Sequence, residues 1–99
     1  MRVLLFQDSG MWIAEALEVD VYAQGTTREN AAANFEETLA LHRAIASEKD
    51  RPAYEEVSRD PPHEIVEAYD KGTVWEPLKK QSSSSVAFRS RVESQASLR

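Results

Sequence analysis

The stretch that decides the fold lies at the start of the chain and runs Val3-Leu4-Leu5-Phe6-Gln7-Asp8-Ser9-Gly10-Met11-Trp12-Ile13-Ala14-Glu15-Ala16-Leu17. Its first four residues are apolar on both faces of an extended strand, and a second apolar run begins at Met11. The residues between the two runs favour a turn, because Asp8 can bond its own backbone and Gly10 accepts a positive φ. Two apolar runs joined by a short turn with glycine predict a β-hairpin.

A third strand and a helix start are predicted directly after the hairpin. Residues 19–23 alternate apolar and mixed side chains, and a glutamine–glycine pair ends this strand. Thr26 and Thr27 are both candidate N-caps. Thr26 together with Glu29 fits the capping box, in which two side chains satisfy backbone donors at the helix start.

A long amphipathic helix is predicted over residues 28–47. This segment has no glycine or proline, and its apolar side chains recur at steps of three and four residues. The predicted apolar stripe consists of Ala31, Ala32, Phe35, Thr38, Leu39, Leu41, His42, Ile45 and Ala46. A helix of this length is about 30 Å long and buries one face.

A second, shorter helix is predicted over residues 61–71. Asp60 supplies an N-cap before two prolines, which the first helical turn tolerates, and Gly72 supplies an end signal. Residues 74–78 are predicted to be extended and to dock their apolar side chains on the body.

Residues 79–99 form a basic, serine-rich tail. Four consecutive serines at 82–85 predict a flexible linker. One side of an extended strand over the following segment would carry Val86, Phe88, Ser90 and Val92. Such a strand can add to a sheet edge, in this chain or in another, or remain disordered. We therefore expect one domain over 1–78 and a tail that is flexible or forms a sheet-edge strand.

The composition describes a single acidic domain. The 99 residues are 41% hydrophobic and 29% charged, and the absence of cysteine excludes disulfides and thiolate metal sites. No apolar run approaches the ~18 residues of a membrane helix, and the short apolar start does not form a signal peptide, so the expected location is cytoplasmic. Residues 1–78 have a formal net charge of −9 and residues 79–99 of +4. An acidic body does not bind nucleic acid through its general surface.

The most specific pattern of the chain is Ala23-Gln24-Gly25-x-Thr27-x-Glu29-x-Ala31, which joins a strand end to a capped helix start. With the strand order before it, this pattern resembles the HicB-like antitoxin family over residues 2–47, about half of the chain. The resemblance implies an α+β, partial RNase H-like domain: a three-stranded antiparallel sheet packed against one long helix, with a fourth strand from the tail and an accessory helix over 61–71. Such a motif identifies a fold better than a function.

The resemblance also implies a function in protein binding. HicB-like antitoxins neutralise HicA, a small basic mRNA interferase, and many carry a C-terminal DNA-binding element. Here Leu17-Glu18-Val19-Asp20 replaces the family's common Pro-x-x-Pro-Gly element, and residues 73–99 show no helix-turn-helix or ribbon-helix-helix pattern. Direct DNA binding is therefore not expected. The expected partner is a HicA-like toxin, and the alternative is a stand-alone homo-oligomeric HicB-like protein of unassigned role.

A metal-dependent nuclease is the remote alternative, because RNase H folds can hold two metal ions between converging carboxylates. The available acids are Asp8, Glu15, Glu18 and Asp20, and no spacing pattern links them. His42 and His63 are distant from each other and form no metal-binding pattern. A phosphate-binding glycine loop and a nucleophile elbow are also missing from the sequence. We expect no catalytic residue, no cofactor and no metal.

Four residues are the candidate contacts for a partner. Trp75 lies in an extended stretch, and tryptophan is enriched at interface hot spots; the alternative is that it docks on the body. Arg89 and Arg91 lie close to Phe88, and cations interleaved with an aromatic ring suit single-stranded nucleic acid; the alternative is a disordered or sheet-edge tail. The expected mechanism is occlusion, in which the acidic body covers a basic RNA-handling protein and the tail adds a strand or wraps around it.

Overall fold

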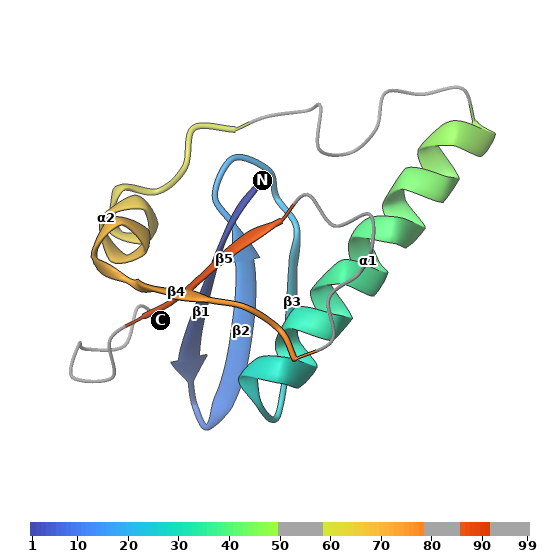
Figure 1. Cartoon of the computed structure of the whole chain (residues 1–99). Coiled ribbons are helices and arrows are strands. Elements are labelled where there is room, and N and C mark those ends of the chain that lie inside the picture. The colour runs from blue at the N-terminus through green and yellow to red at the C-terminus, as the bar shows by residue number, and fades with distance from the viewer. Residues whose placement is uncertain (50–58, 79–85, 92–99) are drawn as a thin grey trace.

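The computed structural model describes residues 1–49, 59–78 and 86–91 (Figure 1). Its elements are β1 (Arg2–Asp8), β2 (Met11–Ala16), β3 (Tyr22–Gly25), α1 (Arg28–Glu48), α2 (His63–Lys71), β4 (Thr73–Trp75) and β5 (Ala87–Ser90). The strands form one sheet in the order β3-β2-β1-β5-β4. β1 pairs in parallel with β5, and the other neighbouring strands are antiparallel. The predicted α+β class is confirmed.

The hairpin predicted from the opening residues is present. β1 and β2 are antiparallel with Asp8 opposite Met11, so the turn consists of Ser9 and Gly10 alone. Both turn residues have a positive φ, 53° for Ser9 and 82° for Gly10. A two-residue turn with positive φ at both positions matches the right-handed twist of the strands that it joins.

β1 is buried on both faces and occupies the middle of the sheet. Val3 and Leu5 belong to a core shared with α1, whereas Leu4 and Phe6 belong to a second core shared with α2. All four side chains are at most 1% exposed. The two helices therefore lie on opposite faces of the sheet, and the domain has three layers (Figure 1).

α1 begins at a capped N-terminus. Thr27 is the N-cap, and its Oγ1 accepts a hydrogen bond from the backbone nitrogen of Asn30 at 3.0 Å. The predicted capping box of Thr26 and Glu29 is wrong. Thr26 Oγ1 accepts from Asn30 Nδ2 at 2.8 Å, and the carboxylate of Glu29 accepts from the backbone nitrogen of Leu78.

The third strand runs later than predicted, over 22–25 in place of 19–23. Val19 and Val21 are buried in the connection between β2 and β3 and fill the core without pairing as a strand. Gly25 ends β3 against the start of α1. A Cβ added there would lie 2.5 Å from the backbone nitrogen of Ala31, so only glycine permits this approach.

The predicted three-stranded antiparallel sheet is wrong, and so is the partial RNase H-like arrangement that was expected to contain it, because the sheet has five strands and is mixed. β5 is the fourth strand expected from the tail, but it lies inside the sheet between β1 and β4 instead of at an edge. The physical reason lies in β1. A strand that is apolar on both faces is typical of the interior of a sheet whose two faces are both covered. The serine-rich linker at 79–85 and residues 92–99 lie outside the described residues.

Both predicted helices are present with shifted ends. α1 covers 28–48 and α2 covers 63–71. Leu41 and Ile45 were expected in the buried stripe of α1 but are 59% and 43% exposed, because the C-terminal half of the helix extends past the sheet (Figure 1). None of the helices in the described ranges is long and apolar enough to span a bilayer.

Two arginines stabilise the connection between β2 and β3. Arg59 donates hydrogen bonds to two backbone carbonyls near the end of β2, at 3.2 and 2.9 Å, and to the buried carboxylate of Glu15 at 3.2 Å. Arg2 donates to the carboxylate of Glu18 at 2.6 Å. This hydrogen bond raises the pKa of Arg2 above its ordinary value. The connection is thus tied both to β1 and to the segment before α2.

We expect Gly25→Ala to lower the free energy of unfolding by about 1–3 kcal/mol, because the added methyl group forces β3 and α1 apart. Urea denaturation followed by circular dichroism measures this change. Gln24→Ala is the matched control, since the Gln24 side chain is exposed on the same strand and its loss should change stability by less than about 0.5 kcal/mol. Equal stability of the two variants would contradict the close packing of Gly25 on α1.

Candidate functional site

α1 covers only part of one face of the sheet. A helix is about 10 Å in diameter and neighbouring strands lie about 4.8 Å apart, so one helix covers roughly two strands. α1 packs mainly on β3 and β2. On the same face, β5 and β4 lie beyond β1 and therefore beside the helix instead of beneath it.

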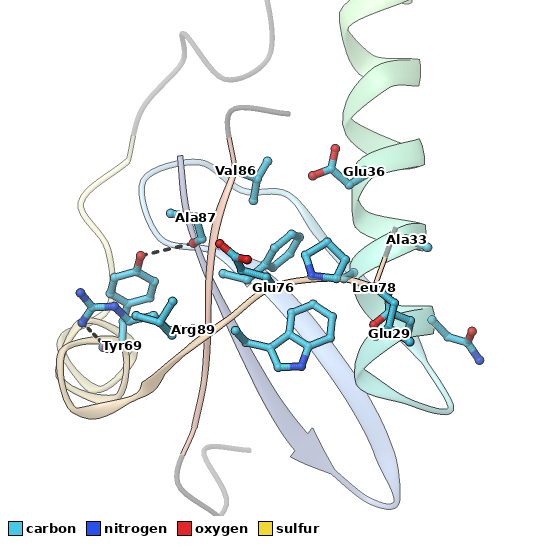
Figure 2. A pocket seen from close by; sticks show the side chains of 15 residues that line it. Glu29, Ala33, Glu36, Tyr69, Glu76, Leu78, Val86, Ala87 and Arg89 are labelled. Atoms are coloured by element: carbon cyan, nitrogen blue, oxygen red, sulfur yellow. Dashed lines mark hydrogen bonds between the residues drawn. The ribbon is translucent and has the colours of Figure 1, made fainter. Parts of the chain in front are cut away.

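A groove of about 710 Å³ results between the N-terminal half of α1 and the β4–β5 end of the sheet (Figure 2). Its lining comes mainly from three segments that are far apart in sequence: the first turns of α1, residues 74–78 and residues 86–89. We call this hollow the α1–β4 groove. Its volume lies within the ~300–1,000 Å³ that is typical of ligand sites.

A row of three aromatic rings runs from α1 to β4 at the base of the groove. The ring centroid of Phe88 lies 6.2 Å from that of Phe35 on α1 and 5.8 Å from that of Trp75 on β4. The interplanar angles are 80° and 89°, and such edge-to-face pairs contribute about 0.5–1.5 kcal/mol each beyond the burial of their area. Phe35 and Phe88 are buried and Trp75 is half-buried, so the indole is the ring that the groove presents to a ligand.

Carboxylates surround this aromatic base. Glu29 and Glu36 extend from α1, and Glu76 follows β4 (Figure 2). Oε1 of Glu29 accepts a hydrogen bond from the backbone nitrogen of Leu78 at 2.8 Å, which ties the segment after β4 to the first turn of α1. Negative charge is favourable at this point, because a helix N-terminus carries a partial positive charge.

Among the described residues that line the groove, Arg89 is the one basic residue, and its guanidinium contacts α2. Nη1 donates to the carbonyl oxygens of Tyr69 and Asp70 at 3.1 and 3.4 Å, and Cζ lies 4.6 Å from the centre of the Tyr69 ring. The Tyr69 hydroxyl donates to the carbonyl oxygen of Ala87 at 3.3 Å (Figure 2). Arg89 therefore caps the last turn of α2, whose carbonyls have no partner within the helix.

The groove brings together three of the four predicted partner contacts. Trp75, Phe88 and Arg89 line it, and Arg91 does not. Phe88 is 4% exposed, so its ring supports Trp75 within the fold. Arg91 is half-buried, and its backbone nitrogen donates to the carbonyl oxygen of Leu5 at 2.8 Å. The tail strand was predicted to add to a sheet of this chain or of another chain. In the structure it is β5, which pairs with β1 and β4 of this chain.

The acidic lining is not among the sequence predictions. Glu29 was expected to form a capping box, and no role was assigned to Glu36 or Glu76. One signal was available, because Glu29 and Glu36 are seven residues apart, about two helical turns, and so share a face of α1. The position of Glu76 beside that face depends on the strand order, which the sequence pattern does not contain.

Asp8 lies apart from the other acids considered for a metal nuclease, and the Arg59 guanidinium lies between Glu15 and Asp20 at 3.2 and 4.0 Å. Asp8 is at the hairpin turn, whereas Glu15 is near the other end of β2. Glu15 is buried and its carboxylate accepts from Arg59, and Glu18 forms an ion pair with Arg2. Within residues 1–49, 59–78 and 86–91, no group of three or more His, Cys, Asp or Glu side chains is arranged to hold a metal ion.

No protein-family model, curated protein or solved structure gives a significant match to the chain. The resemblance to the HicB-like family therefore rests on the sequence pattern alone, with residues 23–31 at its centre. The groove is a separate observation, which does not depend on that resemblance.

We expect Arg89→Met to lower the free energy of unfolding by about 1–2 kcal/mol, because the change removes the donors to the last turn of α2 and retains an apolar stem. Hydrogen exchange should show faster exchange of the α2 amides. Lys71→Met is the control: Lys71 pairs with Glu67 on the exposed side of α2, and its loss should cost less than about 0.5 kcal/mol. A loss of similar size in both variants would contradict the capping role of Arg89.

Proposed function

We propose that this chain is an antitoxin-type binding protein, similar to the HicB-like proteins, that neutralises a small basic RNA-handling protein by covering it. The observation that carries the proposal is the α1–β4 groove, whose lining includes Trp75 and three glutamates. Such a site favours a long basic side chain, because its apolar stem is buried against the ring while its charge remains among opposite charges.

Charge supports occlusion of a protein over binding of RNA itself. Residues 1–78 have a formal net charge of −9, and three of the acids in that count, Glu29, Glu36 and Glu76, line the groove. RNA is a polyanion and is repelled by such a surface, whereas a basic RNA-binding surface attracts it. The chain would therefore compete with RNA for the same basic surface of its partner.

Exposed apolar side chains around the groove supply the remaining contact area. Val74 is 70% exposed and Leu78 is 90% exposed, and both line the groove near Trp75. A stable protein interface buries about 800 Å² on each partner, and its energetic centre is usually an aromatic or arginine anchor surrounded by weaker contacts. Trp75 is placed to be that anchor, and Val74 and Leu78 would supply the weaker contacts around it.

A stand-alone homo-oligomer is the second candidate, and the edge strand β4 favours it. None of the described residues pairs with the outer edge of β4, and Val74 is exposed on this strand. An unprotected edge with apolar side chains favours self-association. Size-exclusion chromatography with light scattering distinguishes the two candidates, since the first requires a second kind of chain and the second requires more copies of this one.

The test begins with the tagged chain in an RNase-treated lysate of its native host, eluted in steps of increasing salt and analysed by mass spectrometry. A small basic protein that is recovered is then purified, and its RNA cleavage is measured against increasing amounts of the chain. We expect complete inhibition at equal stoichiometry. Recovery of the chain alone as an oligomer, or an undiminished cleavage rate, would contradict the proposal.

The double variant Glu36→Gln/Glu76→Gln should weaken this inhibition about two- to thirty-fold, since each exposed charge contact contributes about 0.2–1 kcal/mol and 1.4 kcal/mol corresponds to tenfold. The difference in inhibition between this variant and the unaltered chain should be smaller at high salt, because salt screens the charge contacts that the variant removes. Glu37→Gln/Glu48→Gln removes the same charge from exposed positions of α1 outside the groove and should change inhibition by less than about twofold.

A further inference from the structure

We infer that the outer edge of β4 pairs with β4 of a second copy of this chain. The two strands run antiparallel about a twofold axis at Val74, so the two five-stranded sheets become one continuous sheet. This interface belongs to the second candidate function, the homo-oligomer, and rests on it. It does not require a basic partner.

The two edges of the sheet, β3 and β4, are protected to different degrees. At β3, the carbonyl oxygen of Gln24 accepts a hydrogen bond from Nδ2 of Asn34 on α1 at 2.8 Å, and α1 packs along the strand. At β4, none of the described residues pairs with the outer edge. The three residues of β4 include no charge and no proline, which are the usual features that keep an edge strand from pairing. β4 is therefore the edge that is open to another strand.

The hydrogen bonds of β5 show which of its residues face β4. The backbone nitrogens of Ala87 and Arg91 donate to carbonyl oxygens of the β1 side, at 2.8 Å each. Backbone groups of successive residues alternate between the two sides of a strand. Ala87, the residue two further on and Arg91 therefore face β1, whereas Phe88 and Ser90 face β4.

Val74 directs its backbone N–H and C=O to the open edge. Thr73 and Trp75 lie opposite the two β5 residues that face β4, so their backbone groups point to β5. Val74 lies between them and points the other way. Two opposite residues of a hydrogen-bonded antiparallel pair exchange both of their bonds. Val74 and Val74 of the second copy can therefore form two hydrogen bonds across the twofold axis.

The free stretch of this edge is short and matches a second β4. Before the strand, the backbone nitrogen of Gly72 already donates to the carbonyl oxygen of Tyr69 at 3.0 Å. After the strand, the backbone nitrogen of Leu78 already donates to Glu29 at 2.8 Å. A longer strand from another protein would find these flanking donors occupied. A second copy presents an equally short stretch, so no part of its strand is left without a partner.

The side chains of β4 also suit pairing with themselves. Val74 is 70% exposed and would lie directly opposite its copy, and β-branched side chains pack well in such positions. Trp75 is half-buried and would lie opposite Thr73 of the second copy. Pairs of an aromatic and a β-branched side chain stabilise antiparallel sheets. The contact buries no charge, because all three residues are neutral.

The pairing changes the α1–β4 groove. A twofold axis that relates antiparallel neighbours is perpendicular to the sheet, so corresponding faces of the two copies lie on the same side. Both α1 helices then lie on one face, and the two grooves join across the paired β4 strands. The second copy contributes Thr73 beside Trp75, so the groove of one chain is half of a larger, symmetric site that remains open on the α1 face.

Sedimentation equilibrium of the purified full chain over a series of concentrations tests the pairing. We expect the mass to rise from that of one chain, 11.2 kDa, toward twice that value. Val74→Pro should weaken dimerisation about tenfold or more, because proline removes the outward N–H and leaves the bonds to β5 intact. Val74→Thr keeps the N–H and the branched Cβ and should change the affinity by less than about threefold.

Cysteine crosslinking tests the register and does not depend on the folding of the proline variant. The chain has no cysteine. Val74→Cys places two thiols at opposite positions, where Cα atoms are about 5.5 Å apart and a disulfide can form. Thr73→Cys is the control, because its two copies lie diagonally, about 7–8 Å apart, and cannot bridge without backbone movement. In a glutathione redox buffer we expect a crosslinked dimer from the first variant alone.

A chain that is monomeric at every concentration, equal dimerisation of Val74→Pro and the unaltered chain, or equal crosslinking of the two cysteine variants would overturn the inference. Salt gives a further criterion. The chain has a formal net charge of −5, so screening should strengthen its self-association, whereas it should weaken capture of a basic partner. Dimerisation that weakens as salt is added would also contradict pairing through this neutral strand.

Failure of this interface is distinguishable from failure of the proposed function. If the chain is monomeric but inhibits a basic RNA-handling protein, the occlusion stands and the β4 pairing is wrong. If it dimerises and Val74→Pro has no effect, the homo-oligomer stands and the interface is wrong. If it dimerises through β4 and no RNA-handling protein is captured or inhibited, the interface stands and the antitoxin-type function is wrong.

Discussion

The structure depends on one constraint, the burial of β1 on both faces. Leu4 and Phe6 are apolar on one side of the strand and Val3 and Leu5 on the other, so both faces need cover, which α1 and α2 provide. Such a strand is typical of the interior of a sheet, where each edge has a neighbour. β2 supplies one edge through a two-residue turn. The other edge is supplied by β5, a segment more than 80 residues later in the chain. The order of the sheet and its three layers follow from this requirement.

The same constraint creates the groove. β5 completes the environment of β1, and β4 extends the sheet by one further strand, so the sheet becomes wider than α1 can cover. Phe88 fills the space beside α1 and leaves Trp75 half-buried at the base of the hollow. The candidate site thus lies at the β4–β5 end of the sheet, which α1 does not cover. The buried ring of Phe88 contacts the indole and is itself in contact with Phe35.

Several arginines contact other parts of the domain, whereas most of the charged residues that line the groove are acidic. Arg2, Arg28, Arg59 and Arg89 all form described contacts within the domain, with rings, carbonyls or carboxylates. The charged residues that line the groove are by contrast mostly acidic, with Glu29, Glu36 and Glu76 against Arg89. An arginine used in this way stabilises a helix end or a connection, and it reduces the positive charge that the surface offers.

Local patterns in the sequence determined the hairpin, the capped start of α1, the approximate spans of both helices and the α+β class. These features depend on residues that are close in sequence, such as Ser9 and Gly10 in the turn and Thr27 at the helix start. The sequence also singled out Trp75, as a tryptophan in an extended stretch, and Arg89, as a cation beside Phe88. The extent of the apolar stripe on α1 was misjudged, since exposure of Leu41 depends on where the sheet ends.

Only the tertiary structure decided the five-stranded mixed sheet, the interior position of β5 and the groove with its acidic lining. Each of these depends on the pairing of segments far apart in the chain, and periodicity along one segment contains no information about which neighbour it will take. Glu36 and Glu76 become parts of one site because β5 inserts beside β1 and holds β4 next to α1. The residues carry the chemistry of the site, and the strand order brings them together.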